Sequence, residues 1–298
     1  MTDRAPIPAP GHFEDLPVGA AVDPVSATRE LVAAGISVRR APPEAVARWI
    51  GAGWRDFRTA PGVGLGIGLF CVLFGWAIIA AMWSVESAVL ILPLFTGFML
   101  AAPLLAVPLY EASRRQARGE RPGAGAFLAG FARNRWGIGL MAALLMMFFY
   151  AWLRVATMIW FLFFGLDLPP LDAFLATALA DYAFVVTSFG IGALLAALVF
   201  ALCAVSLPML VDRPVDAMTA AMTSLRACLN NPFTMAIWAV LIAVLTLIGI
   251  GAGLLGLVLV VPVIGHATWH AYADLVGLVE DAGENFESHT RSSAGDAS

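Results

Sequence analysis

Two histidines near the C-terminal end of the chain have the residue type and the spacing that metal or haem chemistry needs. His266 and His270 lie four positions apart, so a helix would place both imidazoles on one face. Such a pair can share a metal ion, and a buried imidazole can ligate haem. However, no third ligand lies beside them, no HExxH motif occurs, and a His/Trp/Tyr belt at the membrane surface explains the same residues. We therefore expect no metal site and no resident cofactor, with haem at this pair as the alternative.

Arg154 lies inside a long apolar run and is a second candidate. An ionisable residue within a membrane span is costly and marks a functional position by default. If the run forms one span, Arg154 lies past mid-depth and would reach outward or pair with Asp167 or Asp181. If the span ends near Trp152, Arg154 lies at the membrane surface. Both alternatives stay open.

Three carboxylates lie at the ends of apolar runs, Glu111, Asp212 and Asp216. Carboxylates in such places can serve a proton path or bind a cation. Alternatively, they cap helices and pair with arginines such as Arg114 and Arg213. A small transporter or channel with a polar path near Arg154 is therefore one functional hypothesis.

Several kinds of active site are excluded by the sequence. The 17 basic residues are all arginine, which rules out a catalytic lysine. No Walker, Rossmann or nucleophile-elbow motif occurs, and the three cysteines form no CxxC pair. The alternating glycines from Gly62 to Gly68 favour a helix-packing face over a phosphate loop. We expect a protein that is not an enzyme and does not bind nucleic acid.

The composition requires that lipid solvates much of the chain. Apolar residues make up 60% and charged residues 13%, and the mean hydropathy is +0.85. Soluble domains are about half apolar and about one quarter charged. The sequence therefore predicts an all-α membrane protein, because helices satisfy their own backbone groups within the bilayer.

The apolar runs predict six transmembrane helices, arranged as three hairpins in a membrane domain from 41 to 280. The glycines between Gly249 and Gly256 predict the break between the last two spans, and one long helix is the alternative. The segments 1–40 and 281–298 are predicted to be disordered cytoplasmic tails. The six predicted spans are 64–83, 88–110, 136–164, 183–210, 233–249 and 252–272.

The arginines predict the orientation. They precede the first span and fill the connections between the second and third spans and between the fourth and fifth, whereas the opposite connections contain none. By the positive-inside rule, the arginine-bearing segments and both termini lie in the cytoplasm. We expect a multi-pass protein of a bacterial inner membrane.

Each predicted hairpin follows a short amphipathic stretch on the cytoplasmic side. A helix of this type can lie at the inner leaflet and favour anionic lipid, or it can pack against the bundle. Proline ends the first stretch at Pro61 and the third at Pro232. The second stretch lacks it but keeps Gly130 and Phe131 in the places of Gly53 and Trp54. We infer three copies of one unit, an amphipathic helix followed by two spans. The membrane-interface candidates of the first copy are Arg48, Trp49, Trp54, Arg55 and Arg58.

Four blocks of the sequence resemble a known bacterial family. They read WIGAGWRDFRTAPGVGLGIG, PLLAVPLYEASRR, LPMLVDRPVDAMTAAMTSLRACLNNP and GHATWHAYADLV. They are similar to successive blocks of DUF2189, a group of predicted integral membrane proteins, over roughly residues 44–278. The resemblance implies a six-span inner-membrane protein with no established activity.

Members of that family are sometimes labelled as relatives of a cytochrome c oxidase subunit. A haem–copper catalytic core needs histidines on several spans, whereas this chain has four histidines, two of them in the tails. We therefore expect a membrane-organising or accessory protein, whose partners are the bilayer, anionic lipid and other membrane proteins. A haem- or metal-binding respiratory accessory protein is the alternative, with His266 and His270 as ligands.

Overall fold

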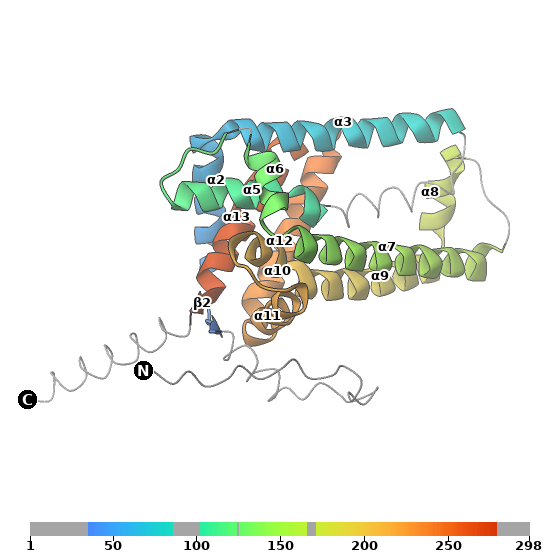
Figure 1. The fold of residues 1–298 in the computed structure, drawn as a ribbon. Helices are drawn as coiled ribbons and strands as arrows, with labels where there is room; N and C mark the ends of the chain where they lie inside the picture. The colour runs from blue at the N-terminus through green and yellow to red at the C-terminus, as the bar shows by residue number, and fades with distance from the viewer. Residues whose placement is uncertain (1–34, 86–101, 124, 166–170, 279–298) are drawn as a thin grey trace, which may run out of the picture.

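The computed structural model describes residues 35–85, 102–123, 125–165 and 171–278. Within these residues the protein is all-α apart from one pair of short strands. Long apolar helices extend away from a cluster of shorter helices that forms one end of the molecule (Figure 1). This architecture is that of an all-α membrane protein.

A short helix leads directly into a long apolar helix three times along the chain. We call the short helices arms. In each case a single residue separates the arm from the long helix, at Ala60, Asn134 and Asn231. The three pairs are α2 (Ala45–Thr59) with α3 (Pro61–Val85), α6 (Ala126–Arg133) with α7 (Arg135–Phe164), and α11 (Ala217–Asn230) with α12 (Pro232–Gly251).

The three separating residues, which we call hinges, share one backbone conformation. Their φ and ψ angles are −141° and 71° at Ala60, −144° and 64° at Asn134, and −133° and 50° at Asn231. A following proline pushes Ala60 and Asn231 out of the α region, because its ring clashes with a helical residue before it. Asn134 instead caps the next helix by accepting a hydrogen bond from the N–H of Gly137. The hinge therefore recurs even where the proline is absent.

The hinges correct the alignment of the second copy. Arg135 occupies the position that Pro61 and Pro232 occupy in the other copies. Phe131 consequently corresponds to Phe57 rather than to Trp54. The sequence pattern hid this shift because the second arm is shorter and has no proline to anchor it.

Three further helices close the copies and gather at the centre of the cluster, and we call them closing helices. They are α5 (Val107–Ala117), α10 (Ser206–Asp212) and α13 (Leu257–Leu275). Each packs on the arm of the following copy, α5 on α6 and α10 on α11, and α13 returns to α2. The three also contact one another. The arms and closing helices thus form a ring that the C-terminal helix closes.

Glycines allow the tightest of these contacts. A Cβ atom at Gly53 would lie 2.6 Å from the backbone nitrogen of Ala267, so α2 and α13 touch through their backbones. Gly68 of α3 lies against the backbone of α13 at Val258, and Gly64 lies against the side chains of Phe57 and Pro262, whereas Gly62 and Gly66 face open space. The predicted glycine face therefore uses two of its four glycines.

The two ends of the described chain pair beside this ring. β1 (Ile36–Val38) and β2 (Val276–Leu278) are antiparallel, with Ser37 opposite Gly277. The predicted disordered tail, which reached residue 40, is wrong for β1. Strands of three residues carry too short a pattern to be recognised, and this one depends on a partner at the other end of the chain.

Four stretches of the described residues are long and apolar enough to cross a membrane. They correspond to the predicted first, third, fourth and fifth spans. Most of the predicted second span, 88–110, lies outside the described residues. The four stretches are Pro61–Ala81, Arg135–Phe164, Tyr182–Asp212 and Pro232–Gly251.

The remaining helices and the last predicted break complete the fold. α9 (Tyr182–Cys203) runs beside α7, and α8 (Leu171–Ala180) precedes it. The chain turns between Gly251 and Leu257, where Gly253 and Leu254 have positive φ angles. α12 and α13 are therefore separate helices, and the segment predicted to begin at 252 becomes helical at Leu257.

Candidate functional site

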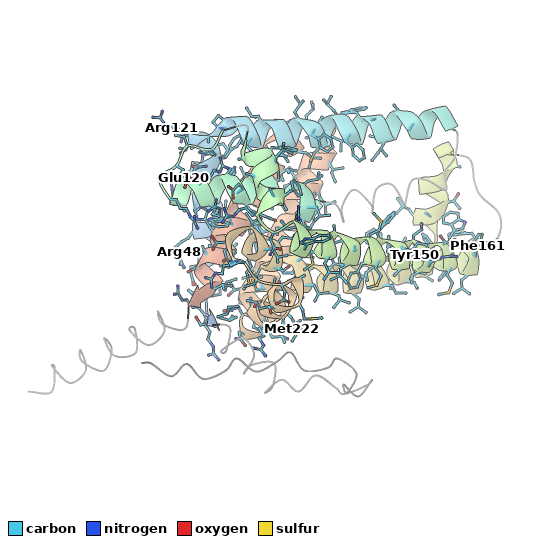
Figure 2. The ribbon with its side chains drawn as sticks, viewed as in Figure 1. Arg48, Glu120, Arg121, Tyr150, Phe161 and Met222 are labelled. Atoms are coloured by element: carbon cyan, nitrogen blue, oxygen red, sulfur yellow. The ribbon has the colours of Figure 1, made fainter. Side chains whose placement is uncertain are left out.

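Polar side chains gather where the arms meet the closing helices. Figure 2 shows Arg48, Glu120 and Arg121 at this end of the molecule, and Tyr150 and Phe161 far from them on α7. Three hydrogen-bonded groups lie here, centred on Asp56, Glu111 and Asp212. We treat this layer as the candidate site because it holds most of the chemistry-bearing residues that the sequence singled out.

The first group joins two histidines to α2 and α5. The Nε2 atom of His270 lies 2.9 Å from Oδ2 of Asp56. The Ser113 hydroxyl lies 2.6 Å from the same carboxylate oxygen and 2.7 Å from Nδ1 of His266. His266 is fully buried, whereas the side chain of His270 is 29% exposed. The group therefore leads from a partly exposed imidazole to a buried one.

Proton positions in this group follow from the carboxylate. Burial raises the pKa of Asp56, but hydrogen bonds from His270 and Ser113 outweigh burial, and the net pKa lies below its usual value. An ionised Asp56 can only accept, so Ser113 donates to it and Nδ1 of a neutral His266 donates to Ser113. Nε2 of His266 is then unprotonated, and it is buried with no hydrogen-bond partner among the described residues.

This order of groups limits the chemistry. In a hydrolase triad the histidine lies between serine and aspartate and takes the serine proton. Here Ser113 lies in the middle and directs its proton to Asp56, whose lowered pKa makes it a weak base. Within the described residues, no group of three or more His, Cys, Asp and Glu side chains is placed to hold a metal ion. The arrangement suits the holding and exchange of protons.

The structure also tests the alternative explanation of the two histidines, a His/Trp/Tyr belt at the membrane surface. Trp269 is 5% exposed and Tyr272 is 2% exposed, and their rings lie 5.4 Å apart. These side chains pack inside the protein, so the explanation as a belt at the membrane surface is wrong. The sequence suggested it because aromatic residues at the end of an apolar run are common at that surface.

The second group is a buried ion cluster on α5. Glu111 is 1% exposed and receives two hydrogen bonds from Arg114, at 2.7 and 2.9 Å, and a third from Arg115 at 2.7 Å. Burial raises the pKa of Glu111, but the two guanidinium groups more than offset it, so the net pKa is lowered. The hydrogen bonds to Glu111 raise the pKa of Arg114. Both charges are therefore held in a place where either one alone would be costly.

The two remaining carboxylates, Asp212 and Asp216, have different structural roles. Asp212 accepts a hydrogen bond of 2.8 Å from the Tyr272 hydroxyl, and so joins α10 to α13. Asp216 caps α11 through the N–H and hydroxyl of Thr219, which lower its pKa. Glu111, Asp212 and Asp216 are thus each engaged within the ring.

The first arm divides between a buried and an exposed face. Trp49 is 2% exposed, its indole N–H donates to Asp274 at 2.9 Å, and Arg48 pairs with the same carboxylate. The structure therefore places Trp49 inside the protein rather than at a membrane surface. Trp54, Arg55 and Arg58 are exposed.

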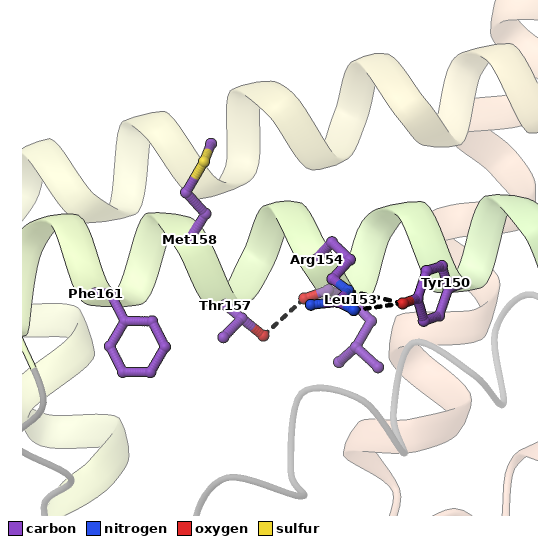
Figure 3. A pocket seen from close by; sticks show the side chains of 6 residues that line it. All are labelled: Tyr150, Leu153, Arg154, Thr157, Met158 and Phe161. Carbon is purple, nitrogen blue, oxygen red and sulfur yellow. Dashed lines mark hydrogen bonds between the residues drawn. The ribbon is translucent and has the colours of Figure 1, made fainter.

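Arg154 lies apart from the layer on an outward face of α7. α7 is unbroken from Arg135 to Phe164, so the helix does not end near Trp152. The guanidinium donates to the hydroxyl of Tyr150 on the same helix, with an Nε–O distance of 2.9 Å. The described residues around it form an open hollow along this single helix (Figure 3). Of the two predicted partners, Asp181 caps α9 and Asp167 lies outside the described residues.

The hypothesis of a shared polar path needs Arg154 beside at least one of the three carboxylates. Glu111 bonds to arginines on its own helix, Asp212 to Tyr272, and Asp216 to Thr219. Arg154 bonds to Tyr150 and is exposed. Among the described residues, the structure does not bring these side chains together.

Several residues of the layer carried no sequence signal. Asp56 and Ser113 are 57 positions apart, and His270 is 214 positions from Asp56. Asn231 holds Arg39 and Ala41 in the segment before α2, and Asn134 holds Val215 before α11. Only the asparagines had a local clue, because a polar residue between two apolar helices is a natural cap.

Comparison with known proteins gives one match. Residues 91–212 match the family model DUF2189, described as "Predicted integral membrane protein". The matched stretch includes α5, α6, α7, α9 and α10, and so one complete arm, hinge and long helix with two closing helices. No curated protein sequence and no solved structure matches the chain. Residues 91–212 are thus similar to a family of predicted integral membrane proteins, and the described chain has several apolar helices long enough to cross a membrane.

Proposed function

We propose that this chain is a non-enzymatic, six-span protein of a bacterial inner membrane, built as three arm-and-hairpin copies with both termini in the cytoplasm. Its function in this proposal is to organise lipid or assist other membrane proteins through a collar of arms at the cytoplasmic surface. The observation that carries the proposal is that each arm buries one face in the ring and leaves apolar side chains exposed beside a long apolar helix.

The two faces of the arms differ in the same way in all three copies. Each arm contacts a closing helix. Gly53 and Gly130 meet that helix closely, and Ala220 on the third arm is buried. The opposite faces carry large side chains with much of their surface free. Those exposed on the arms are Trp54 at 40%, Phe127 at 48%, Leu128 at 75%, Met218 at 70% and Leu229 at 68%.

Exposed apolar side chains at this level suit the boundary between headgroups and acyl chains. Each arm ends one residue before a helix that is long and apolar enough to cross a membrane, so the arms lie near the membrane surface. Aromatic and arginine side chains favour that depth. Arg55 and Arg58 add charge on the exposed face of α2, and each would contribute about 1 kcal/mol with an anionic leaflet.

The arrangement of the ring supports the cytoplasmic placement. All three hinges lie at the end of the molecule where the arginines concentrate, and β1 and β2 place both ends of the described chain there as well. The positive-inside rule assigns an arginine-rich end to the cytoplasm. An even number of spans also follows from chain ends on one side.

The test compares arginines on the exposed face of α2 with an arginine on the same helix that forms an ion pair. Arg55→Gln with Arg58→Gln removes two exposed charges, whereas Arg48→Gln removes a charge that is already paired with Asp274. The full chain would be extracted with its surrounding lipid into polymer-bounded discs, and the ratio of anionic to zwitterionic lipid would be measured. We expect a lower ratio for the double variant and little change for Arg48→Gln. An unchanged ratio in the double variant would overturn the lipid-organising role.

A further inference from the structure

A cavity of about 500 Å³ lies among the long helices, on the membrane side of the ring. Its wall is formed by residues of α3, α5, α7, α9, α12 and α13, and most of them are aliphatic or aromatic. None of the described lining residues is charged. The volume falls within the range of small-molecule pockets, about 300–1,000 Å³. An uncharged, largely apolar ligand would fit this chemistry, and an ion would not.

Two tryptophans of the wall carry unused hydrogen-bond donors. Trp152 on α7 is 8% exposed and Trp238 on α12 is fully buried. The indole N–H of each is buried without a hydrogen-bond partner among the described residues. A buried donor without an acceptor is costly, and each such group in a native protein calls for an explanation.

The other polar groups of the wall do not accept hydrogen bonds from these two indoles. The Thr268 hydroxyl donates to the backbone oxygen of Ile264 at 2.8 Å and is therefore engaged within its own helix. Cys71 and Cys203 line the wall as free thiols, which are weak acceptors. The hydroxyls of Tyr110 and Thr246 also line the wall, but neither accepts a hydrogen bond from Trp152 or Trp238. No acceptor in the described part of the wall is therefore placed for either indole, and a ligand oxygen would supply one.

We propose that this cavity binds a neutral lipid that carries a carbonyl oxygen, with the carbonyl accepting from the indole N–H of Trp238 or Trp152 and the apolar body filling the remaining space. The lack of charge among the described lining residues disfavours a phosphate-bearing headgroup in the cavity. Two sources share the required chemistry, a prenyl-tailed quinone and a diacylglycerol. This inference concerns a different surface from the arms and does not depend on the proposed function.

The experiment titrates the detergent-purified full chain with three probes and counts bound molecules by native mass spectrometry. The probes are a short-tailed benzoquinone, a diacylglycerol and an alkane of matched size that lacks a carbonyl. Trp238→Phe keeps an aromatic ring and removes the N–H, and it should weaken carbonyl-lipid binding roughly five- to tenfold. Trp136→Phe is the matched control, because Trp136 is 80% exposed on α7 outside the cavity.

A second variant blocks the cavity without removing a tryptophan, so that a loss of binding can be distinguished from a folding defect. Val199 lines the cavity, and Val199→Phe fills its space without removing a hydrogen bond. This variant should abolish binding of both carbonyl lipids while the protein keeps its elution position in size-exclusion chromatography. Binding of either carbonyl lipid with these variant effects supports the site and identifies its source. Equal binding of the alkane, unchanged binding by both Trp238→Phe and the corresponding Trp152→Phe, or no binding by any probe would overturn it.

Discussion

The ring end of the molecule and the far half of α7 differ in how their polar groups are held. In the ring, Glu111 and Asp56 each bond to two other side chains, and the bonds of Asp56 join three helices. On α7, Arg154 bonds to Tyr150 one turn away on its own helix and faces outward. Both regions contain charge beside apolar sequence, yet only the ring uses that charge to connect elements.

This difference shows where the fold is specified. The outer parts of the long helices expose large apolar residues such as Leu140, Met146 and Leu162, and lipid can solvate them without a particular partner. The closing helices are buried, and their polar groups need particular partners. We expect substitutions in the ring to alter stability strongly and substitutions on the outward face of α7 to alter it weakly.

The largest expected effect is the loss of the buried ion cluster. Glu111→Gln would leave Arg114, which is 4% exposed, without its hydrogen-bonded carboxylate and should reduce the free energy of unfolding by about 3–5 kcal/mol. SDS titration in mixed micelles measures this quantity. The matched control is Asp274→Asn, which breaks a partly exposed pair and should have a much smaller effect. Similar losses in the two variants would remove the contrast between buried and exposed charge.

The contact between α2 and α13 depends on a glycine, so a methyl group added there tests how closely the ring is packed. Gly53→Ala would force the two helices apart, because its Cβ would meet backbone atoms of Ala267 and Val263, and should lose about 1–3 kcal/mol. Gly51→Ala on the same arm meets only the end of Arg55 at 3.9 Å and should be neutral or slightly stabilising. If both variants unfold at the same SDS concentration, the close packing of this arm is not as described.

Acid should weaken the ring before it affects the outer part of α7. The folded-state pKa of Asp56 lies below its ordinary 3.8, so its contribution is present above that value and is lost as the pH falls through the folded-state pKa. Asp56→Asn should therefore be less stable than the parent at pH 7 by about 1 kcal/mol, and the difference should shrink toward pH 3. A difference that stays constant over this range would show that the carboxylate charge is not involved.

The smallest effect is expected at Arg154. Arg154→Gln removes an exposed charge whose hydrogen bonds lie within one helix, and it should change the free energy of unfolding by less than about 0.5 kcal/mol. The same SDS titration measures it. A loss above about 2 kcal/mol would place Arg154 in a network comparable to the ring.

The sequence predicts the repeated unit for a physical reason. A proline after a polar or small residue cannot continue the preceding helix, so Pro61 and Pro232 mark two hinges by residue type alone. The glycines near Gly253 mark the turn before α13 in the same way. These are local effects, and local effects can be recognised in one sequence.

The polar layer could be predicted only in part, because its bonds join distant positions. His266 and His270 stand out by their spacing, but nothing near them points to Ser113 or Asp56. Trp49 has the sequence character of a membrane-surface residue, and burial under α13 is decided by the closure of the ring. Tertiary contacts of this kind override the local sequence pattern, so the partners of these side chains can be identified only in the folded structure.

The proposed collar of three arms on the cytoplasmic side can be tested by cysteine labelling. Arg58→Cys, Ala132→Cys and Asn230→Cys would each be placed singly in a chain whose three native cysteines are replaced, because all three positions are exposed and none is among the apolar side chains proposed to enter the lipid. A membrane-impermeant maleimide would be added to inside-out and right-side-out vesicles. We expect labelling of all three positions in inside-out vesicles alone. Labelling of any one arm from the opposite side would contradict the collar and the six-span arrangement together.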